Sequence, residues 1–315
     1  MGESSQDGGL RQRRTSNAAE TLISTAKEME HAIEDTLLML WDELPSWRRD
    51  NAFIKSGYRQ SRGSYMHSLR SLFYIHNESV NIWSHLVGAV CAAAASLYLY
   101  GVIHPRYESA NFDDVVVFGC FFAGAVLCLG MSATFHMLLN HSETVATWGN
   151  KLDYTGIVAL IVGSYVPALY YGLFCRPSLM KVYLILICTL GTGCGLVSWI
   201  DRFRRPELRA YRALMFVALG LSSIVPIVHA VSIYGYQGLD ERMSVSLVIL
   251  HGAMYIFGAF LYAVRWPERS APGSFDIWGN SHQIFHFFVV LAAATHLYAM
   301  ARAFDYHHTV ASQCI

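Results

Sequence analysis

Charged residues are scarce in this chain, and their scarcity excludes an ordinary soluble domain. Asp, Glu, Lys and Arg make up 15% of the 315 residues, whereas hydrophobic residues make up 54%. Soluble domains typically carry about 25% charged residues. The charge is also uneven, because residues 1–78 are polar and long apolar runs begin at Val80. The composition therefore predicts an integral membrane protein.

Three further absences narrow the class. No apolar stretch precedes residue 80, and the first residues include Arg11, Arg13 and Arg14, so we expect no signal peptide. Ten-residue segments of alternating hydrophobicity, the signature of a membrane β-barrel, are missing. The seven cysteines form no C-x-x-C pair, and their odd number argues against a complete disulfide framework. Helices are therefore expected to cross the membrane.

Seven apolar stretches have the length of a membrane-spanning helix. A helix needs roughly 20 residues to cross a hydrocarbon core of about 30 Å. The expected spans are residues 80–103, 115–139, 152–173, 180–200, 210–234, 244–265 and 281–304. The predicted fold class is an all-α membrane protein, with a seven-transmembrane-helix bundle over residues 80–304 and a short outer tail over residues 305–315.

The basic residues predict how this bundle is oriented. If the N-terminus is cytoplasmic, the N-terminal region and the loops after the second, fourth and sixth spans hold 18 of the 23 Lys and Arg residues. Cytoplasmic segments carry an excess of basic residues. The bias therefore predicts a cytoplasmic N-terminus and a C-terminus on the outer side. Whether the membrane is the plasma membrane or the endoplasmic reticulum is left open.

Five polar residues are predicted to meet at the inner end of three spans. His282 and His286 are four residues apart, so they lie on one face of the seventh span. Ser132 and His136 lie near the inner end of the second span, and Asp153 at the inner start of the third. Three imidazoles with an open fourth position suit a catalytic-type zinc site, in which a carboxylate and a hydroxyl orient a water. Separate buried histidines, the alternative, would not share one depth.

Four other histidines, His85, His229, His251 and His296, each stand alone in a span. His296 lies more than two turns beyond His286, so it cannot share the predicted zinc site. Interhelical hydrogen bonds are the favoured interpretation for all four, with the lining of an internal cavity as the alternative.

The cytoplasmic N-terminal region, residues 16–79, contains an amphipathic pattern. Apolar residues recur at spacings of three and four between Leu22 and Leu40, which predicts an amphipathic helix that ends before Pro45. This helix is expected to pack under the bundle, to pair with a partner helix or to lie on the inner leaflet. Residues 1–15 are expected to be disordered. The segment from Trp47 to Asn51 is predicted to clamp the zinc side.

Four segments resemble one known family. They are LPSWRRDNAFIKSGYR (44–59), SLFYIHNESVNIWSHLVG (71–88), SATFHMLLNHSETVATWGNKLDYTGI (132–157) and RWPERSAPGSFDIWGNSHQIFHFFVVLAAATHLY (265–298). They are similar to signature segments of the adiponectin receptor and progestin receptor family, which is related to hemolysin III. The resemblance implies zinc bound by His136, His282 and His286, with Ser132 and Asp153 reached through water. The short N-terminal tail resembles that of fungal members, which are associated with zinc and with sterol or lipid homeostasis.

Two functional classes follow. In the first, zinc is catalytic, Asp153 is the general base, Ser132 orients the water or the substrate carbonyl, and the substrate is a lipid amide. The resemblance implies that this lipid is ceramide. In the second, the chain is a receptor with structural zinc, and its ligand is extracellular or is a lipid (ceramide or a fatty acid) in a cavity between helices. Zinc transport fits poorly, because no second site lies across the bilayer. We expect no nucleic-acid partner, and a homo-oligomer is left open.

Overall fold

A computed structural model describes residues 25, 37–106, 110–310 and 314. The long helices are α3 (Ser79–Arg106), α4 (Phe112–Leu138), α5 (Glu143–Leu173), α6 (Pro177–Ser198), α7 (Arg209–Leu221), α8 (Ile224–Met243), α9 (Val245–Val264) and α10 (Ser281–Thr309). The short helices are η1 (Trp41–Glu43), η2 (Ser46–Arg48), α2 (Tyr65–Arg70), η3 (Ser71–Phe73), η4 (Asp201–Arg204) and η5 (Pro206–Leu208). Within the described residues, the only extended pairing is one isolated bridge between Met39 and Tyr58.

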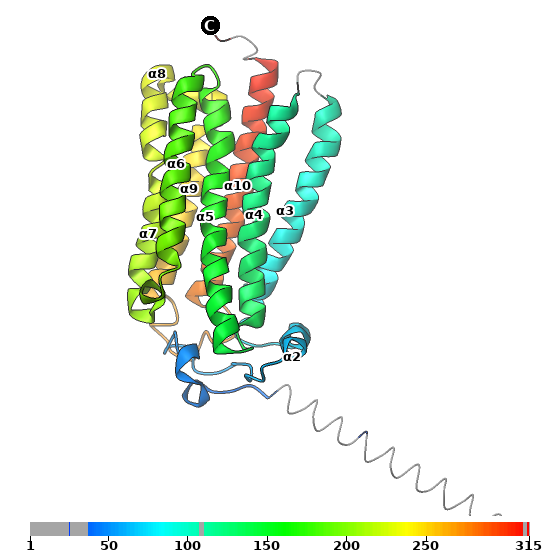
Figure 1. Cartoon of the computed structure of the whole chain (residues 1–315), viewed down its shortest axis with the longest axis vertical. Coiled ribbons are helices and arrows are strands. Elements are labelled where there is room, and N and C mark those ends of the chain that lie inside the picture. Colours follow the sequence, from blue (N-terminus) through cyan, green and yellow to red (C-terminus); the bar gives the residue numbers. More distant parts are fainter. Residues whose placement is uncertain (1–24, 26–36, 107–109, 311–313, 315) are drawn as a thin grey trace, which may run out of the picture.

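The described residues contain seven helical segments that are long and apolar enough to cross a membrane, with α7 and α8 together forming the fifth. These helices stand side by side, with the segment before α3 at one end of the bundle and the C-terminus at the other (Figure 1). Large apolar side chains cover its outside, including Leu97, Ile185 and Leu196, which are 68–76% exposed. So much exposed apolar surface suits a hydrocarbon environment. The predicted seven-helix membrane fold is confirmed, and the orientation of its termini stays a prediction.

The third spanning helix begins earlier than expected. α5 starts at Glu143 and not near residue 152, because the Ser142 side chain accepts a hydrogen bond from the Val145 amide and caps the helix. Its first turns are polar, which is why a hydropathy pattern places them in a loop. At the other end of the bundle α10 continues to Thr309, beyond the expected end near residue 304.

The fifth span is broken in the middle. α7 ends at Leu221 and α8 begins at Ile224. The hydroxyl of Tyr165, on α5, donates to the Gly220 carbonyl at 3.0 Å. A break inside a membrane helix is tolerated where a neighbouring side chain satisfies the backbone groups that it releases. The predicted fifth span is confirmed as one membrane-spanning segment, Arg209–Met243, and the sequence pattern does not indicate its interruption at Ser222 and Ser223.

Residues 37–78 are folded against the bundle, and the helices among these described residues are short. Residues 37–40, the expected end of the amphipathic helix, are extended, because the Met39 amide donates to the Tyr58 carbonyl at 2.6 Å. This pairing corrects the predicted end of that helix. Its remainder, apart from Thr25, and the disordered tail predicted for residues 1–15 lie outside the described residues.

α4 and α5 approach each other closely through glycine. A Cβ added to Gly156 would lie 2.7 Å from the Cα of Cys128, and one added to Gly163 would lie 2.5 Å from the carbonyl oxygen of Cys120. Small residues at such crossings let two backbones come together in membrane bundles. The close crossing brings polar side chains of the two helices within reach of each other.

One disulfide joins Cys175, after α5, to Cys314, across a sequence separation of 139 residues. The other described cysteines are free, and Cys128 and Cys194 are buried in helices. No local spacing indicates this disulfide, which ties a residue in the turn between α5 and α6 to the C-terminal end of the chain.

Candidate metal centre

Three histidines from two helices converge at the bundle end next to the segment before α3. His136 lies in the last turn of α4, and His282 and His286 lie in the first two turns of α10. One ring nitrogen of each residue lies within 4.8 Å of the others. The ring centroids are 4.8–4.9 Å apart. The three predicted ligands are therefore brought to one point because α4 and α10 both pack against α3 and α5.

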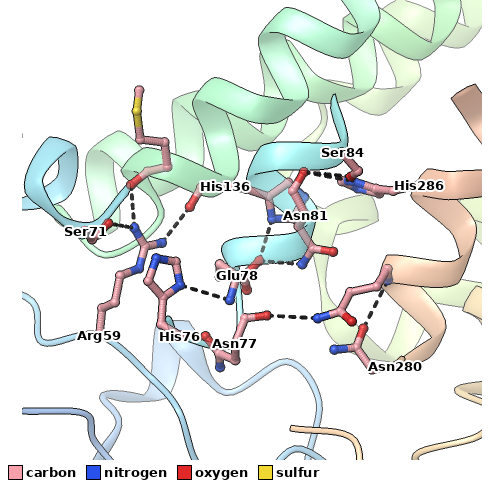
Figure 2. Close-up of polar contacts among 12 residues, drawn as sticks. Arg59, Ser71, His76, Asn77, Glu78, Asn81, Ser84, His136, Asn280 and His286 are labelled. Atoms are coloured by element: carbon pink, nitrogen blue, oxygen red, sulfur yellow. Dashed lines mark hydrogen bonds and ion pairs between the residues drawn. The ribbon is translucent and has the colours of Figure 1, made fainter. Parts of the chain in front are cut away.

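Hydrogen bonds fix which nitrogen two of these rings present. His136 Nδ1 lies 2.7 Å from Glu78 Oε2, and His286 Nδ1 lies 3.1 Å from the Asn81 carbonyl oxygen (Figure 2). Because carboxylate and carbonyl oxygens only accept, each neutral ring carries its proton on Nδ1 and offers the Nε2 lone pair. His136 Nε2 is buried and has no hydrogen-bond partner among the described residues. Zinc-binding histidines characteristically donate their other N–H in this way, so the donor set fits zinc.

Glu78 is a site residue that the sequence analysis missed. Its side chain, 16% exposed, also accepts a hydrogen bond from Asn81 Nδ2 at 2.6 Å (Figure 2). Burial by itself would raise the pKa of this carboxyl, but the charge and hydrogen bond of His136 hold it below its ordinary value. One feature of the sequence could have indicated Glu78, namely that an acidic side chain stands directly before the first span of a chain that carries little charge. Pairing with His136 is invisible in sequence because 58 positions separate the two residues.

Arg59 supports the helix end that carries His136. Its guanidinium, 0% exposed, donates to the His136 carbonyl at 2.6 Å, to the Met137 carbonyl at 2.9 Å and to the Ser71 hydroxyl at 2.7 Å (Figure 2). The last carbonyls of a helix lack partners within the helix, and a buried cation satisfies them. Burial lowers the pKa of Arg59 to about 10, so it keeps its charge at neutral pH. Burial and the nearby Arg59 charge lower the pKa of His76 to about 3.

The first turn of α10 is held by Glu268. This fully buried carboxylate accepts hydrogen bonds from the Ser281 amide at 2.8 Å and from the Ser281 hydroxyl at 2.5 Å. Asn51 donates to the same carboxylate at 3.1 Å. A carboxylate at a helix N-terminus satisfies free amides and suits the helix dipole. Asn51 therefore contacts the residue that holds the first turn of α10, next to His282, and the clamp expected of the segment from Trp47 to Asn51 stays a prediction.

Ser132 and Asp153 meet beside the histidines. Ser132 is 2% exposed and lies one turn before His136 on α4. Both residues line the same cavity as the two histidines of α10. The sequence places Asp153 at the start of its helix, but α5 begins at Glu143, so Asp153 lies ten residues inside it.

A cavity of ≈ 240 Å³ extends from this cluster into the bundle. Its wall is mainly apolar and comes from α3, α4, α5, α7, α8, α9 and α10, with residues such as Ile157, Leu160, Phe216 and Val289. Cavities with apolar walls and a few convergent polar groups are typical of ligand sites. A hydrocarbon chain would fit the wall, with its polar end at the histidines.

Three of the single histidines, His85, His251 and His296, line this cavity. The lining of an internal cavity, the alternative interpretation from the sequence, therefore describes these three histidines better than an interhelical hydrogen bond. His85 stacks on His286, with ring centroids 3.6 Å apart. The interhelical bond is confirmed for His229, whose Nδ1 lies 2.8 Å from the Tyr183 hydroxyl.

Comparison with known proteins identifies the family. A model of the family described as haemolysin-III related matches residues 73–297. The ADIPOR-like receptor IZH2 of Saccharomyces cerevisiae is 44% identical over 271 residues, which cover 86% of this chain and 85% of the yeast protein. The adiponectin receptor protein of Drosophila melanogaster is 42% identical over 87% of this chain, which spans 61% of the fly protein. The heptahelical transmembrane protein 4 of Arabidopsis thaliana is 32% identical over 82% of this chain and 86% of its own length. The chain therefore belongs to the haemolysin-III related family, with adiponectin receptor-like proteins among its relatives.

Proposed function

We propose that this chain is a receptor-like membrane protein that binds zinc and hydrolyses the amide of a ceramide-like lipid, in lipid and zinc homeostasis. The observation that carries the proposal is the set of His136, His282 and His286 beside Asp153, at the mouth of an apolar cavity. Two of the three rings present Nε2, the nitrogen that a metal would use. The relatives named receptors support the receptor-like part of the proposal.

Each residue then has a chemical role. When bound, zinc supplies the Lewis acidity that activates water at neutral pH. Asp153 accepts a proton from the attacking water, and the Ser132 hydroxyl donates to the substrate carbonyl or positions the water. The water oxygen bonds to the acyl carbon, the C–N bond breaks and the proton passes to the leaving amine. The products are a free fatty acid and sphingosine, with the acyl chain in the apolar cavity.

The proposed orientation keeps the N-terminus cytoplasmic and the metal centre at the inner leaflet. The bias of basic residues supports it. The Cys175–Cys314 disulfide supports it as well, because disulfides persist outside the cell or in the lumen of the endoplasmic reticulum, where the C-terminal end of the bundle would lie.

The test is ceramide hydrolysis by the purified protein, with zinc content measured in the same samples. Asp153→Asn should keep the fold and the zinc and lose hydrolysis by about 10²-fold or more, the range expected for removal of a general base. Asp113→Asn, an exposed change at the opposite end of the bundle, is the matched control and should behave as wild type. Equal hydrolysis by wild type and Asp153→Asn, with zinc retained, would refute the role of Asp153 as general base. The receptor with structural zinc would then be the remaining proposal.

A further inference from the structure

A second set of polar side chains lies deeper in the same cavity. His251 and Tyr255 are one turn apart on α9, and His296 lies on the adjacent α10. The ring centroids of His251 and His296 are 4.7 Å apart, and those of His251 and Tyr255 are 5.8 Å apart. All three residues line the cavity that begins at the metal centre. We refer to His251, Tyr255 and His296 as the deep polar group.

The deep polar group is short of hydrogen-bond partners. His296 is 1% exposed, and neither of its ring nitrogens has a partner among the described residues. The same holds for His251 Nδ1 and the Tyr255 hydroxyl. Buried polar atoms are nearly always hydrogen-bonded, since leaving one without a partner costs about 1–3 kcal/mol. Polar atoms in this state along a cavity wall indicate a polar group of the cavity's ligand.

The atoms in need of partners define that polar group. Each neutral imidazole carries one N–H group, which needs an acceptor such as a hydroxyl oxygen. A neutral imidazole then still offers a bare nitrogen, which needs a donor, while the Tyr255 hydroxyl offers a proton. A hydroxyl both donates and accepts, so it satisfies both kinds of atom. A carboxylate would only accept and would bring an unpaired charge into the bundle interior.

The spacing along α10 sets where the hydroxyl belongs on the ligand. Ten residues separate His286 from His296, which corresponds to about 15 Å along a helix. The cavity wall between them is mainly apolar, with Val289 on α10 and Leu160 on α5. A ligand that spans both ends is therefore a hydrocarbon chain with one polar end at the metal centre and a hydroxyl about 15 Å away.

We propose that the deep polar group is a subsite for a hydroxyl on the hydrocarbon chain of the lipid ligand, so that the cavity prefers hydroxylated over plain acyl chains. The proposal rests on the proposed function only for the placement of the ligand's polar head at the three histidines. The proposal adds that the cavity selects ligands by a hydroxyl on their hydrocarbon chain, which a purely apolar cavity would not do.

The experiment compares the binding of stearic acid and 12-hydroxystearic acid to the purified full-length, zinc-loaded protein, by competition with a fluorescent fatty acid. Wild type should bind the hydroxy acid about 5-fold more tightly for each hydrogen bond gained. The O-methyl ether of the hydroxy acid, which keeps the oxygen but cannot donate, should lose most of this preference. Equal affinity of wild type for the plain and hydroxylated acids would overturn the proposal.

Variants assign the preference to named groups. Tyr255→Phe removes only a hydroxyl, and His296→Phe keeps an aromatic ring against Phe121, so both should bind stearic acid normally and lose the preference. Ile185→Val changes an exposed side chain on the outside of the bundle, away from the cavity, and should leave the ratio unchanged. A preference that survives in the Tyr255→Phe/His296→Phe double variant would also overturn the proposal. Fatty acids contain no amide, so these measurements are independent of whether ceramide is hydrolysed.

Discussion

Replacement of Glu78 should weaken zinc binding although Glu78 is not a predicted ligand. The contact between His136 Nδ1 and Glu78 Oε2, at 2.7 Å, is short and largely buried. Carboxylates that hold a ligating histidine typically contribute 10–100-fold to metal affinity. This range corresponds to about 1.4–2.8 kcal/mol, which matches the roughly 1.5–3 kcal/mol attributed to hydrogen bonds with charged groups.

Two substitutions at this position should give graded effects. Glu78→Gln keeps an oxygen that can accept from His136 and loses the charge, so zinc affinity should fall by about 10-fold. Glu78→Ala also leaves the Asn81 amide and His136 Nδ1 without their acceptor, so the loss should approach about 100-fold. Glu143→Gln, at an exposed position in the first turn of α5, is the control and should match wild type.

The assay is competition for zinc between the purified protein and a fluorescent chelator, with thermal unfolding measured in parallel with and without zinc. A tenfold loss of affinity should reduce the stabilisation by saturating zinc by about 1.4 kcal/mol. Wild-type zinc affinity in a folded Glu78→Ala variant would refute the conclusion that this carboxylate fixes the His136 ring for metal binding.

Three further outcomes follow from the same geometry. The His282→Ala/His286→Ala variant should lose stoichiometric zinc in metal analysis, since a single imidazole is left, and full occupancy would contradict the assigned ligands. A tag at Ser4 should resist external protease in intact cells while a C-terminal tag is reached from the outside or lumen, and the reverse pattern would move the metal centre to the other leaflet. Gly156→Val should lower the free energy of unfolding by about 1–3 kcal/mol because the added Cβ would press on the α4 backbone. Gly119→Val, where an added Cβ meets nothing within 4 Å, should be far milder, and equal effects of the two glycine changes would argue against the close α4–α5 crossing.

The sequence by itself determined the membrane class, the seven spans and the three histidines. Apolar length is a local property of the chain, since a helix must be long enough to cross the hydrocarbon core. The four-residue spacing of His282 and His286 sets their shared face without any knowledge of neighbouring helices. The alternation of spans and loops gives each residue a depth in the membrane. His136 is predicted to lie with His282 and His286 because all three have the same depth.

Tertiary structure alone decided which side chains meet across helices. Glu78 contacts His136 because α3 packs against α4, and hydropathy says nothing about which helix faces are in contact. The break between α7 and α8 depends on Tyr165, a side chain from another helix. The cavity links the metal centre to His251 and His296 through walls contributed by seven helices. Local periodicity fixes the face and the depth of a residue, whereas its partners follow from packing between segments far apart in the chain.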